Sequence, residues 1–246
     1  MNKKYLSLLL LAAVAVAFVS SCRKHNDNTT DLTRNYMPLT FGKYVVYDVD
    51  SIYYNENLCT QYRTKSQIKY AITDTFTDKR NFYNRTSYII DVYVRPYDGA
   101  PWKPQSVIIA NPTGNSLNWS QDQIKYVKMM FPVTEGQTWK GNQYAPLNDP
   151  QFTFLTNWDY TYKNYRKSYN TGYLNFDNTV TVLENDESVN YPDVDTGVAA
   201  YRVYSKAVYA YNVGLVYREL TYWTYKAYNS QCLNGYSVVM RAIDHN

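Results

Sequence analysis

Aromatic residues that alternate with polar ones recur along this chain, and this pattern limits the fold more than any other feature. The clearest case runs from Trp158 to Tyr169 with the sequence WDYTYKNYRKSY. Successive side chains of a β-strand point to opposite sides, so Trp158, Tyr160 and Tyr162 would share one face of it. The chain contains 29 Tyr but only 9 Gly. Because aromatic and β-branched residues suit a half-buried pleated surface, the pattern predicts strands.

Further strand-like segments follow one another, separated by turn residues. The strongest hairpin signal is Asn212-Val213-Gly214, where Gly permits the positive φ that such a turn needs. No helical segments alternate with the strands, which argues against βαβ architectures. We therefore expect an all-β fold with at most one short helix, as a curved antiparallel sheet, an open or closed β-barrel, or a LolA-like half barrel. The expected strands are 43–54, 61–76, 88–95, 107–110, two within 117–131, 158–169, 178–184, 201–211, 215–225 and 236–243.

The N-terminus has the pattern of an export signal. Lys3 and Lys4 precede an apolar run over 6–19, which is short for a membrane span and typical of a signal peptide. The following VSSC resembles the bacterial lipobox, in which the Cys thiol is diacylated before cleavage. That resemblance implies a signal peptide over 1–21 and acyl chains such as palmitate on Cys22, which would anchor the protein to a membrane. The alternative is an ordinary signal peptide cut near Ser20.

The remaining chain divides into a tether and one domain. Residues 22–37 are polar and predict a flexible tether, and residues 38–246 predict a single antiparallel β domain. A domain of this size buries a large enough hydrophobic core to fold without a stabilising disulfide or metal ion. Two cysteines remain after Cys22, Cys59 and Cys232, in a compartment that permits disulfides. The sequence leaves open whether they pair.

Charge and motifs exclude several classes of function. The net charge is +4 with both signs interspersed, so no nucleic-acid partner is expected. The chain has two histidines, His25 in the tether and His245 beside the C-terminus, which argues against a Ser-His-acid apparatus. Phosphate loops, nucleophile elbows and zinc motifs are missing from the sequence. We expect no enzyme, no cofactor and no metal site; Asp193 and Asp195 begin a calcium-like loop that lacks its later ligands.

Paired carboxylates would escape a motif search, because a glycan hydrolase needs only two acids at a suitable separation. Candidates, each on an expected strand, are Asp91, Asp159 and Glu219. The alternative interpretation of each candidate is an acidic side chain exposed at the surface.

Two segments are expected to be loops. The segment 185–197 predicts a polar loop, and Glu184, Asp186 and Glu187 are expected to form a solvated acidic turn. The segment 138–150 predicts a long loop in which Trp139 packs as an aromatic plug.

Two aromatic stripes and one hydroxyl are candidate sites. The stripes would stack sugar rings or line a groove for acyl chains, or else they are the core and wet edges of a Tyr-rich sheet. Ser51 follows Asp50 and precedes Ile52, which resembles the acceptor pattern of Bacteroidota O-glycosylation. A place inside the first strand would make Ser51 inaccessible. The stripes are Trp158, Tyr160 and Tyr162, and Tyr217, Trp223 and Tyr225.

Three longer stretches, YMPLTFGKYVVYDVD, VGLVYREL and the terminal RAIDHN, resemble an uncharacterised family of Bacteroidota cell-envelope lipoproteins with one β-rich domain. The resemblance implies a lipid-anchored protein of the cell envelope, in the outer membrane, and a fold class, but no activity. Arg23, Lys24 and His25 follow the Cys, which leaves the periplasmic and surface faces both open. We expect a non-catalytic β domain that binds a glycan, lipid or envelope-protein partner or braces an assembly, with a glycan hydrolase as the alternative.

Overall fold

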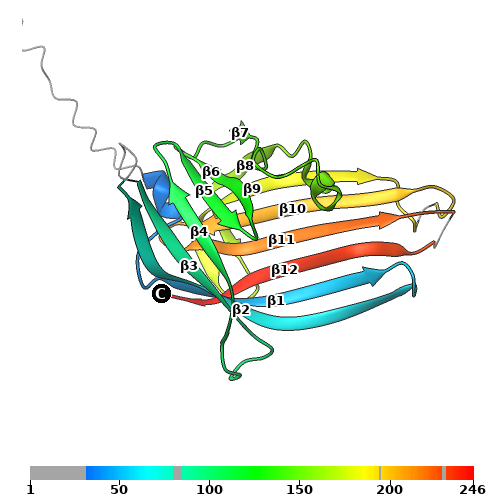
Figure 1. Ribbon diagram of the computed structural model, residues 1–246, viewed down its shortest axis with the longest axis horizontal. Helices are drawn as coiled ribbons and strands as arrows, with labels where there is room; N and C mark the ends of the chain where they lie inside the picture. Colours follow the sequence, from blue (N-terminus) through cyan, green and yellow to red (C-terminus); the bar gives the residue numbers. More distant parts are fainter. Residues whose placement is uncertain (1–31, 80–84, 194, 229–230) are drawn as a thin grey trace, which may run out of the picture. The chain divides into compact units, whose positions relative to one another are not determined.

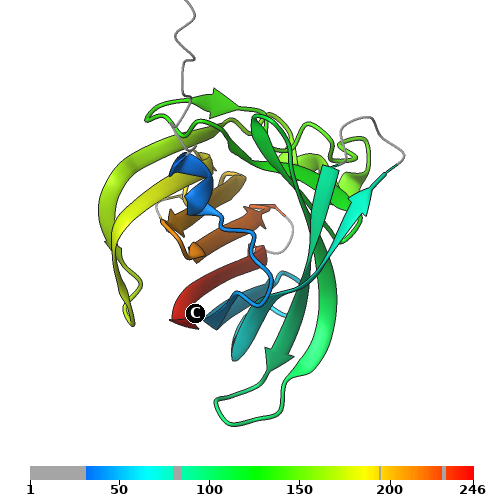
Figure 2. The ribbon, with the colours of Figure 1, turned by 90° about the vertical axis from the view of Figure 1, so that its left-hand side faces the viewer.

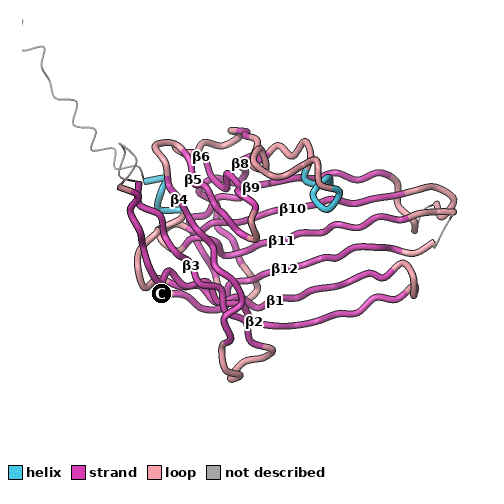
Figure 3. Tube along the Cα trace, in the orientation of Figure 1, coloured by secondary structure: helices cyan, strands magenta, loops and turns pink. Residues whose placement is uncertain are grey.

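The computed structural model describes residues 32–79, 85–193, 195–228 and 231–246. The chain separates into the units Met1–Leu32 and Thr33–Asn246, and the second unit is the folded domain considered below. Nearly all of its described residues lie in strands or loops (Figure 3), which confirms the all-β prediction. Two short 3-10 helices, η1 (Leu32–Tyr36) and η2 (Pro150–Leu155), accompany the strands.

Twelve strands of the described residues form one sheet in which every neighbouring pair is antiparallel. The order across the sheet is β6-β5-β4-β3-β2-β1-β12-β11-β10-β9-β8-β7. The first strand therefore pairs with the last, and all other neighbours are consecutive along the chain (Figure 1). The strands are β1 (Tyr44–Asn55), β2 (Thr60–Asp78), β3 (Arg85–Arg95), β4 (Lys103–Pro112), β5 (Ser116–Gln121), β6 (Ile124–Met130), β7 (Thr138–Trp139), β8 (Tyr160–Asn170), β9 (Asn175–Val189), β10 (Ala200–Ala210), β11 (Gly214–Tyr225) and β12 (Leu233–His245).

The sheet curls until its two edges approach each other (Figure 2), so it is nearly closed and barrel-like. Isolated hydrogen bonds, rather than a ladder, join these edges. The Val127 amide donates to the Gly141 carbonyl at 2.8 Å, and the Trp139 indole donates to the Val127 carbonyl at 2.7 Å. The Tyr162 hydroxyl bonds both backbone groups of Met130. These bonds satisfy backbone groups that an edge strand would otherwise leave unpaired.

Helix η1 lies at one end of the curl. Tyr36 is 1% exposed and its hydroxyl donates to the Asn178 side chain at 2.5 Å. The Asn35 carbonyl accepts from the Asn212 amide at 2.7 Å. Residues 33–37 are thus part of the domain, which corrects the predicted end of the tether at residue 37. Tyr36 supplies the apolar surface that the rest of the tether lacks, and this explains why the chain packs here.

Strand β9 continues to Val189, so the polar loop expected over 185–197 is shorter than predicted. The acidic residues pair with β10, where Asp186 faces Tyr204 in the register. Strand β4 likewise begins at Lys103, before Pro104, and not at Val107. Ladder pairing with a neighbouring strand extends both segments past residues that favour turns.

Cys59 and Cys232 form a disulfide, with their Cα atoms 5.3 Å apart. Cys59 lies in the turn between β1 and β2, and Cys232 directly precedes β12. The bond therefore joins the ends of neighbouring strands at one end of the sheet. The structure thus answers the question that the sequence left open, whether these two cysteines pair.

Candidate functional site

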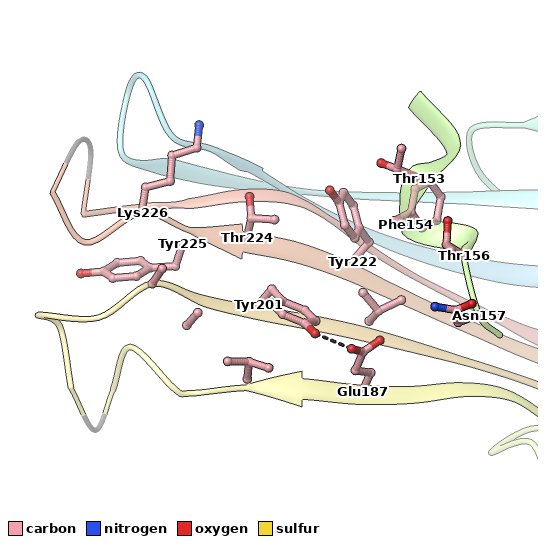
Figure 4. A pocket seen from close by; sticks show the side chains of 14 residues that line it. Thr153, Phe154, Thr156, Asn157, Glu187, Tyr201, Tyr222, Thr224, Tyr225 and Lys226 are labelled. Atoms are coloured by element: carbon pink, nitrogen blue, oxygen red, sulfur yellow. Dashed lines mark hydrogen bonds between the residues drawn. The ribbon is translucent and has the colours of Figure 1, made fainter. Parts of the chain in front are cut away.

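The long strands β10, β11, β12, β1 and β2 extend beyond the shorter strands β4–β6 (Figure 1). On their inner face lies a groove of about 730 Å³, bounded by β9, β10, β11 and the η2 region (Figure 4). Its aromatic residues are Phe154, Tyr201, Tyr222 and Tyr225. Its polar residues are Thr153, Thr156, Asn157, Glu187, Thr224 and Lys226.

Four tyrosines cross the same inner face in one line, which we call the tyrosine row: Tyr62, Tyr53, Tyr236 and Tyr222. Strand register produces it, because Tyr53 faces both Tyr62 and Tyr236, and Tyr236 also faces Tyr222. The rings of Tyr53 and Tyr62 stack with centroids 4.9 Å apart, and those of Tyr222 and Tyr236 meet edge to face at 6.1 Å. Phe154 of η2 stacks on Tyr222 at 4.7 Å and ends the row.

The tyrosine row is partly exposed to solvent, and its hydroxyls are not bonded to other described residues. Tyr62 is 56% exposed and Tyr53 37% exposed, while Tyr222 and Tyr236 are half-buried. Within the described ranges, none of the four hydroxyls forms a hydrogen bond. Burial raises the pKa of Tyr236 above its ordinary value, so this hydroxyl stays protonated at neutral pH and can donate a hydrogen bond. The row therefore offers ring surface and free hydroxyls together.

Glu187 is the acidic side chain of the groove. The Tyr201 hydroxyl donates to its carboxylate (Figure 4), which fixes the carboxylate beside the ring. Hydrogen bonding to Glu187, with a smaller effect from burial, raises the pKa of Tyr201. The groove thus holds a positioned acceptor among several aromatic rings.

Deeper inside the curl lies a charged pair that the sequence analysis missed. The Lys128 ammonium contacts the Glu184 carboxylate at 2.8 Å, and the Ser205 hydroxyl donates to the same carboxylate at 2.6 Å. Both charged side chains are buried. Burial lowers the pKa of Lys128 to about 8 against the opposing effect of Glu184. Burial opposes ionisation of Glu184, but Lys128 and Arg218 outweigh it and lower its pKa.

The structure contradicts most of the expected aromatic binding face. Trp158, which precedes β8, is 4% exposed, and Tyr160 and Tyr162 of β8 are 0% exposed, because this segment packs where the sheet edges meet. They are core residues and form no platform. In the second stripe, Tyr217 is buried against Tyr169, and Trp223 is half-buried. Of the six predicted residues, Tyr225 is the one that lines the groove.

The remaining predicted site residues fall in different places. Ser51 is 7% exposed between β2 and β12, so the O-glycosylation prediction is wrong: the strand buries this hydroxyl. Asp91, Asp159 and Glu219 contact Tyr93, Lys140 and Tyr217 respectively, and none of these acids lines the groove. Cys22 lies outside the described residues, and its lipidation stays a prediction.

Glu184 and Glu187 also depart from their prediction as parts of a solvated acidic turn. Glu184 is 1% exposed inside the sheet, whereas Glu187 is exposed but belongs to strand β9 and lines the groove. A register shift in the β9–β10 pairing beside Glu184 lets these two residues, three positions apart, face the same side. Among the described residues, no cluster of His, Cys, Asp and Glu side chains is suited to hold a metal ion. No helix found in the described ranges has the length and apolar character to cross a membrane.

Comparison with known proteins gives little further information. No protein-family model matches the chain, and no curated protein matches it. A presumed exported protein with a YmcC-like fold from Bacteroides fragilis NCTC 9343 is similar in structure, with a TM-score of 0.41 and 11% sequence identity. The similarity covers 85% of this chain and 98% of that chain.

Proposed function

We propose that this protein is a non-catalytic glycan-binding module of the cell envelope, which holds a sugar chain on the tyrosine row. The observation that carries the proposal is a line of two exposed and two half-buried tyrosine rings, whose hydroxyls bond no described residue, beside a groove of about 730 Å³. A tyrosine joins a flat apolar surface to a polar end. A sugar ring has the complementary character, with apolar C–H faces and hydroxyls around its edge.

The chemistry of the groove favours a sugar over an acyl chain. Thr153, Asn157, Glu187 and Thr224 lie among its rings. An acyl chain would cover these groups without bonding them, and burying an unpaired polar group costs about 1–3 kcal/mol in proteins. Sugar hydroxyls would both donate to Glu187 and accept from the tyrosines. The same surface therefore selects for a ligand rich in hydroxyls.

The proposal includes a lipid anchor on Cys22, which is supported by the lipobox-like VSSC sequence. Acyl chains on this residue would keep the binding domain at a membrane. Labelling of cells with radioactive palmitate should mark the wild-type protein and not Cys22→Ser. Equal labelling of both proteins would disprove the anchor while leaving the binding proposal intact.

Binding is tested by titrating the purified protein with cellohexaose, xylohexaose, mannohexaose and hexagalacturonate in a calorimeter. We expect at least one hexasaccharide to bind. Tyr222→Ala should then raise its Kd about tenfold or more, equivalent to about 1.4 kcal/mol. Tyr97→Ala is the matched control, because this ring is 68% exposed outside the groove and should leave the Kd unchanged.

Two results would contradict the proposal. The first is the absence of binding for all four hexasaccharides at millimolar concentration. The second is binding that Tyr222→Ala and Tyr97→Ala weaken equally, because the tyrosine row would then not be the site. Titration with phosphatidylethanolamine–phosphatidylglycerol vesicles checks the lipid alternative, and Tyr222-dependent vesicle binding without sugar binding would replace the glycan assignment.

A further inference from the structure

A second cavity, of about 370 Å³, lies on the inner face of the sheet next to the tyrosine row. Strands β2, β3, β11 and β12 form its apolar wall, which includes Leu220, Val238 and Met240. Gln105 of β4 and Gln121 at the end of β5 contribute amide groups. Arg218 of β11 is the cation that lines this cavity.

The Arg218 side chain is half-buried, and its guanidinium has no partner among the described residues. In the part of the chain that the structure describes, it forms no ion pair within 4.0 Å and no hydrogen bond. A guanidinium carries five N–H donors. Lys128 illustrates the usual arrangement, because it is buried with its charge paired to Glu184. Arg218 therefore has donors available for a ligand.

The charges around Arg218 leave the interior positive. Burial opposes the charge on Arg218, but the Glu184 carboxylate together with the hydroxyls of Tyr70, Tyr160 and Tyr209 outweighs burial and raises the pKa of Arg218, so the guanidinium stays charged. Glu184 already accepts bonds from Lys128 and Ser205. The two cations thus share one buried carboxylate. Asp122, the acid that lines the cavity, is exposed at the β5–β6 turn, where water screens its charge.

We propose that the Arg218 cavity binds the carboxylate of an acidic ligand. A planar guanidinium matches a carboxylate through two parallel hydrogen bonds. One uncompensated positive charge suits a monoanion better than a phosphate, which carries up to two negative charges at neutral pH. The amides of Gln105 and Gln121 can bond polar groups beside the carboxylate, and the apolar wall can contact its carbon skeleton.

The position of Arg218 connects this cavity to the tyrosine row. Arg218, Leu220 and Tyr222 alternate on the inner face of β11, and four residues of strand span about 13 Å. One oligosaccharide with a uronic acid can therefore reach both sites. A free fatty acid offers the same carboxylate, so the source of the carboxylate has to be decided by experiment. The Arg218 site does not depend on the proposed sugar binding at the tyrosine row.

Calorimetry with two matched ligand pairs tests the proposal. Trigalacturonate is compared with its methyl ester, and decanoate with decanol. We expect the acid of at least one pair to bind about tenfold or more tightly than its neutral partner. Binding by trigalacturonate alone assigns the carboxylate to a sugar, and binding by decanoate alone assigns it to a fatty acid. Failure of both acids to bind more tightly than their neutral partners would overturn the proposal.

Variants at Arg218 make the test specific. Arg218→Met removes the charge while keeping the length of the side chain, and it should abolish the preference for the acid. Arg218→Lys keeps the charge without the planar fork, and it should retain part of the preference and keep the protein folded if the methionine variant does not fold. Arg241→Met on neighbouring β12 is the control and should bind like wild type. Equal acid binding by wild type and both Arg218 variants would contradict the proposal.

The two binding proposals can be disproved independently of each other. Loss of hexasaccharide binding in Tyr222→Ala, with no preference for acids in wild type, would support the tyrosine row alone. A preference for acids that disappears in Arg218→Met, in a protein that binds no neutral sugar, would support the cavity alone.

Discussion

At the scale of single residues, Glu184 is a buried carboxylate that interacts with two cations inside the sheet. Its carboxylate contacts the Lys128 ammonium at 2.8 Å. It also has the largest effect of any neighbouring group in raising the pKa of Arg218. Removing it would leave two cations uncompensated in a buried setting. Removing Lys128 instead would leave Glu184 with Arg218 and the Ser205 hydroxyl. The two partners of this ion pair are therefore unequal.

We predict that Glu184→Gln destabilises the protein more than Lys128→Met. Breaking a buried pair by removing one partner costs about 3–5 kcal/mol, and Glu184→Gln should fall in this range. Lys128→Met should cost less because Arg218 still compensates the carboxylate. Urea unfolding measures both. Lys140→Met is the control, since its exposed pair with Asp159 should contribute about 1 kcal/mol or less. Equal losses for the two buried variants would contradict this inequality.

The pH dependence of the same variants provides a second check. The pKa of Glu184 is lowered from 4.5 in the folded protein. Its stabilisation is therefore complete above pH 4.5 and is lost as the pH falls through the folded-state pKa. The stability gap between wild type and Glu184→Gln should narrow over that acidic range.

Part of this arrangement could be predicted from sequence. Val180, Val182 and Glu184 alternate on β9, and their shared burial follows from the two-residue period of a strand. That period would have placed Glu184 on the inner face. Its partner Lys128 lies 56 residues away along the chain, and no local pattern joins the two. The absence of a partner for Arg218 among the described residues likewise depends on the folded interior and not on a local sequence pattern.

At the scale of elements, the meeting of the two sheet edges depends on a close approach at Gly141. A Cβ atom added there would lie 2.4 Å from two ring carbons of Tyr160. That ring is fully buried, and its hydroxyl donates to Asn142 at 2.8 Å. The Gly141 carbonyl also accepts the bond from Val127 across the edges. The absence of a side chain at this position thus permits the closure.

We predict that Gly141→Ala destabilises the protein by about 1–3 kcal/mol, because overpacking forces a buried side chain or the backbone to move. Gly114→Ala is the matched control. A Cβ there meets nothing within 4 Å, so its effect should stay within about 0.5 kcal/mol. Chemical unfolding of both variants measures the difference. Equal midpoints for Gly141→Ala and wild type would show that Tyr160 moves freely, against the packing described above.

The strands were more predictable than the contacts between the sheet edges. Alternating aromatic residues and turn signals identified most strands, including the hairpin of β10 and β11. The segment 138–150 was expected to be a loop with Trp139 as a plug, and Trp139 is buried there within a two-residue strand. Its indole bond to Val127 crosses from one edge to the other. Such bonds depend on how far the sheet curls, which residue periodicity does not determine.

At the scale of the whole molecule, the tyrosine row is shared by four strands and aligned by their register. Sequence alone marked Tyr217, Trp223 and Tyr225 on β11, but Tyr222 is the residue of that strand in the row. Tyr53, Tyr62 and Tyr236 lie in three other strands, and their alignment requires that β1 pair with β12. Pairing between the first and last strands is the least local feature of the fold, so the row could not be assembled from the sequence.

The Cys59–Cys232 disulfide joins these strands at the end of the sheet that carries the tyrosine row. It links positions 173 residues apart. Closing a loop of this length restricts the unfolded chain and stabilises the fold by up to about 5 kcal/mol in the chain-entropy model. Tyr53 and Tyr62 lie on either side of the turn that contains Cys59. The disulfide should therefore support both the fold and the alignment of the row.

We predict that Cys59→Ser/Cys232→Ser lowers the free energy of unfolding by about 2–5 kcal/mol, measured by urea unfolding under oxidising conditions. The same variant should bind a hexasaccharide recognised by wild type more weakly, because the strand ends that align Tyr53 and Tyr236 are no longer joined. Wild type treated with dithiothreitol should match the variant in both measurements, whereas the variant itself should not respond to the reductant. A loss of stability with unchanged Kd would show that strand pairing alone aligns the tyrosine row, and unchanged stability would contradict the structural role of the disulfide.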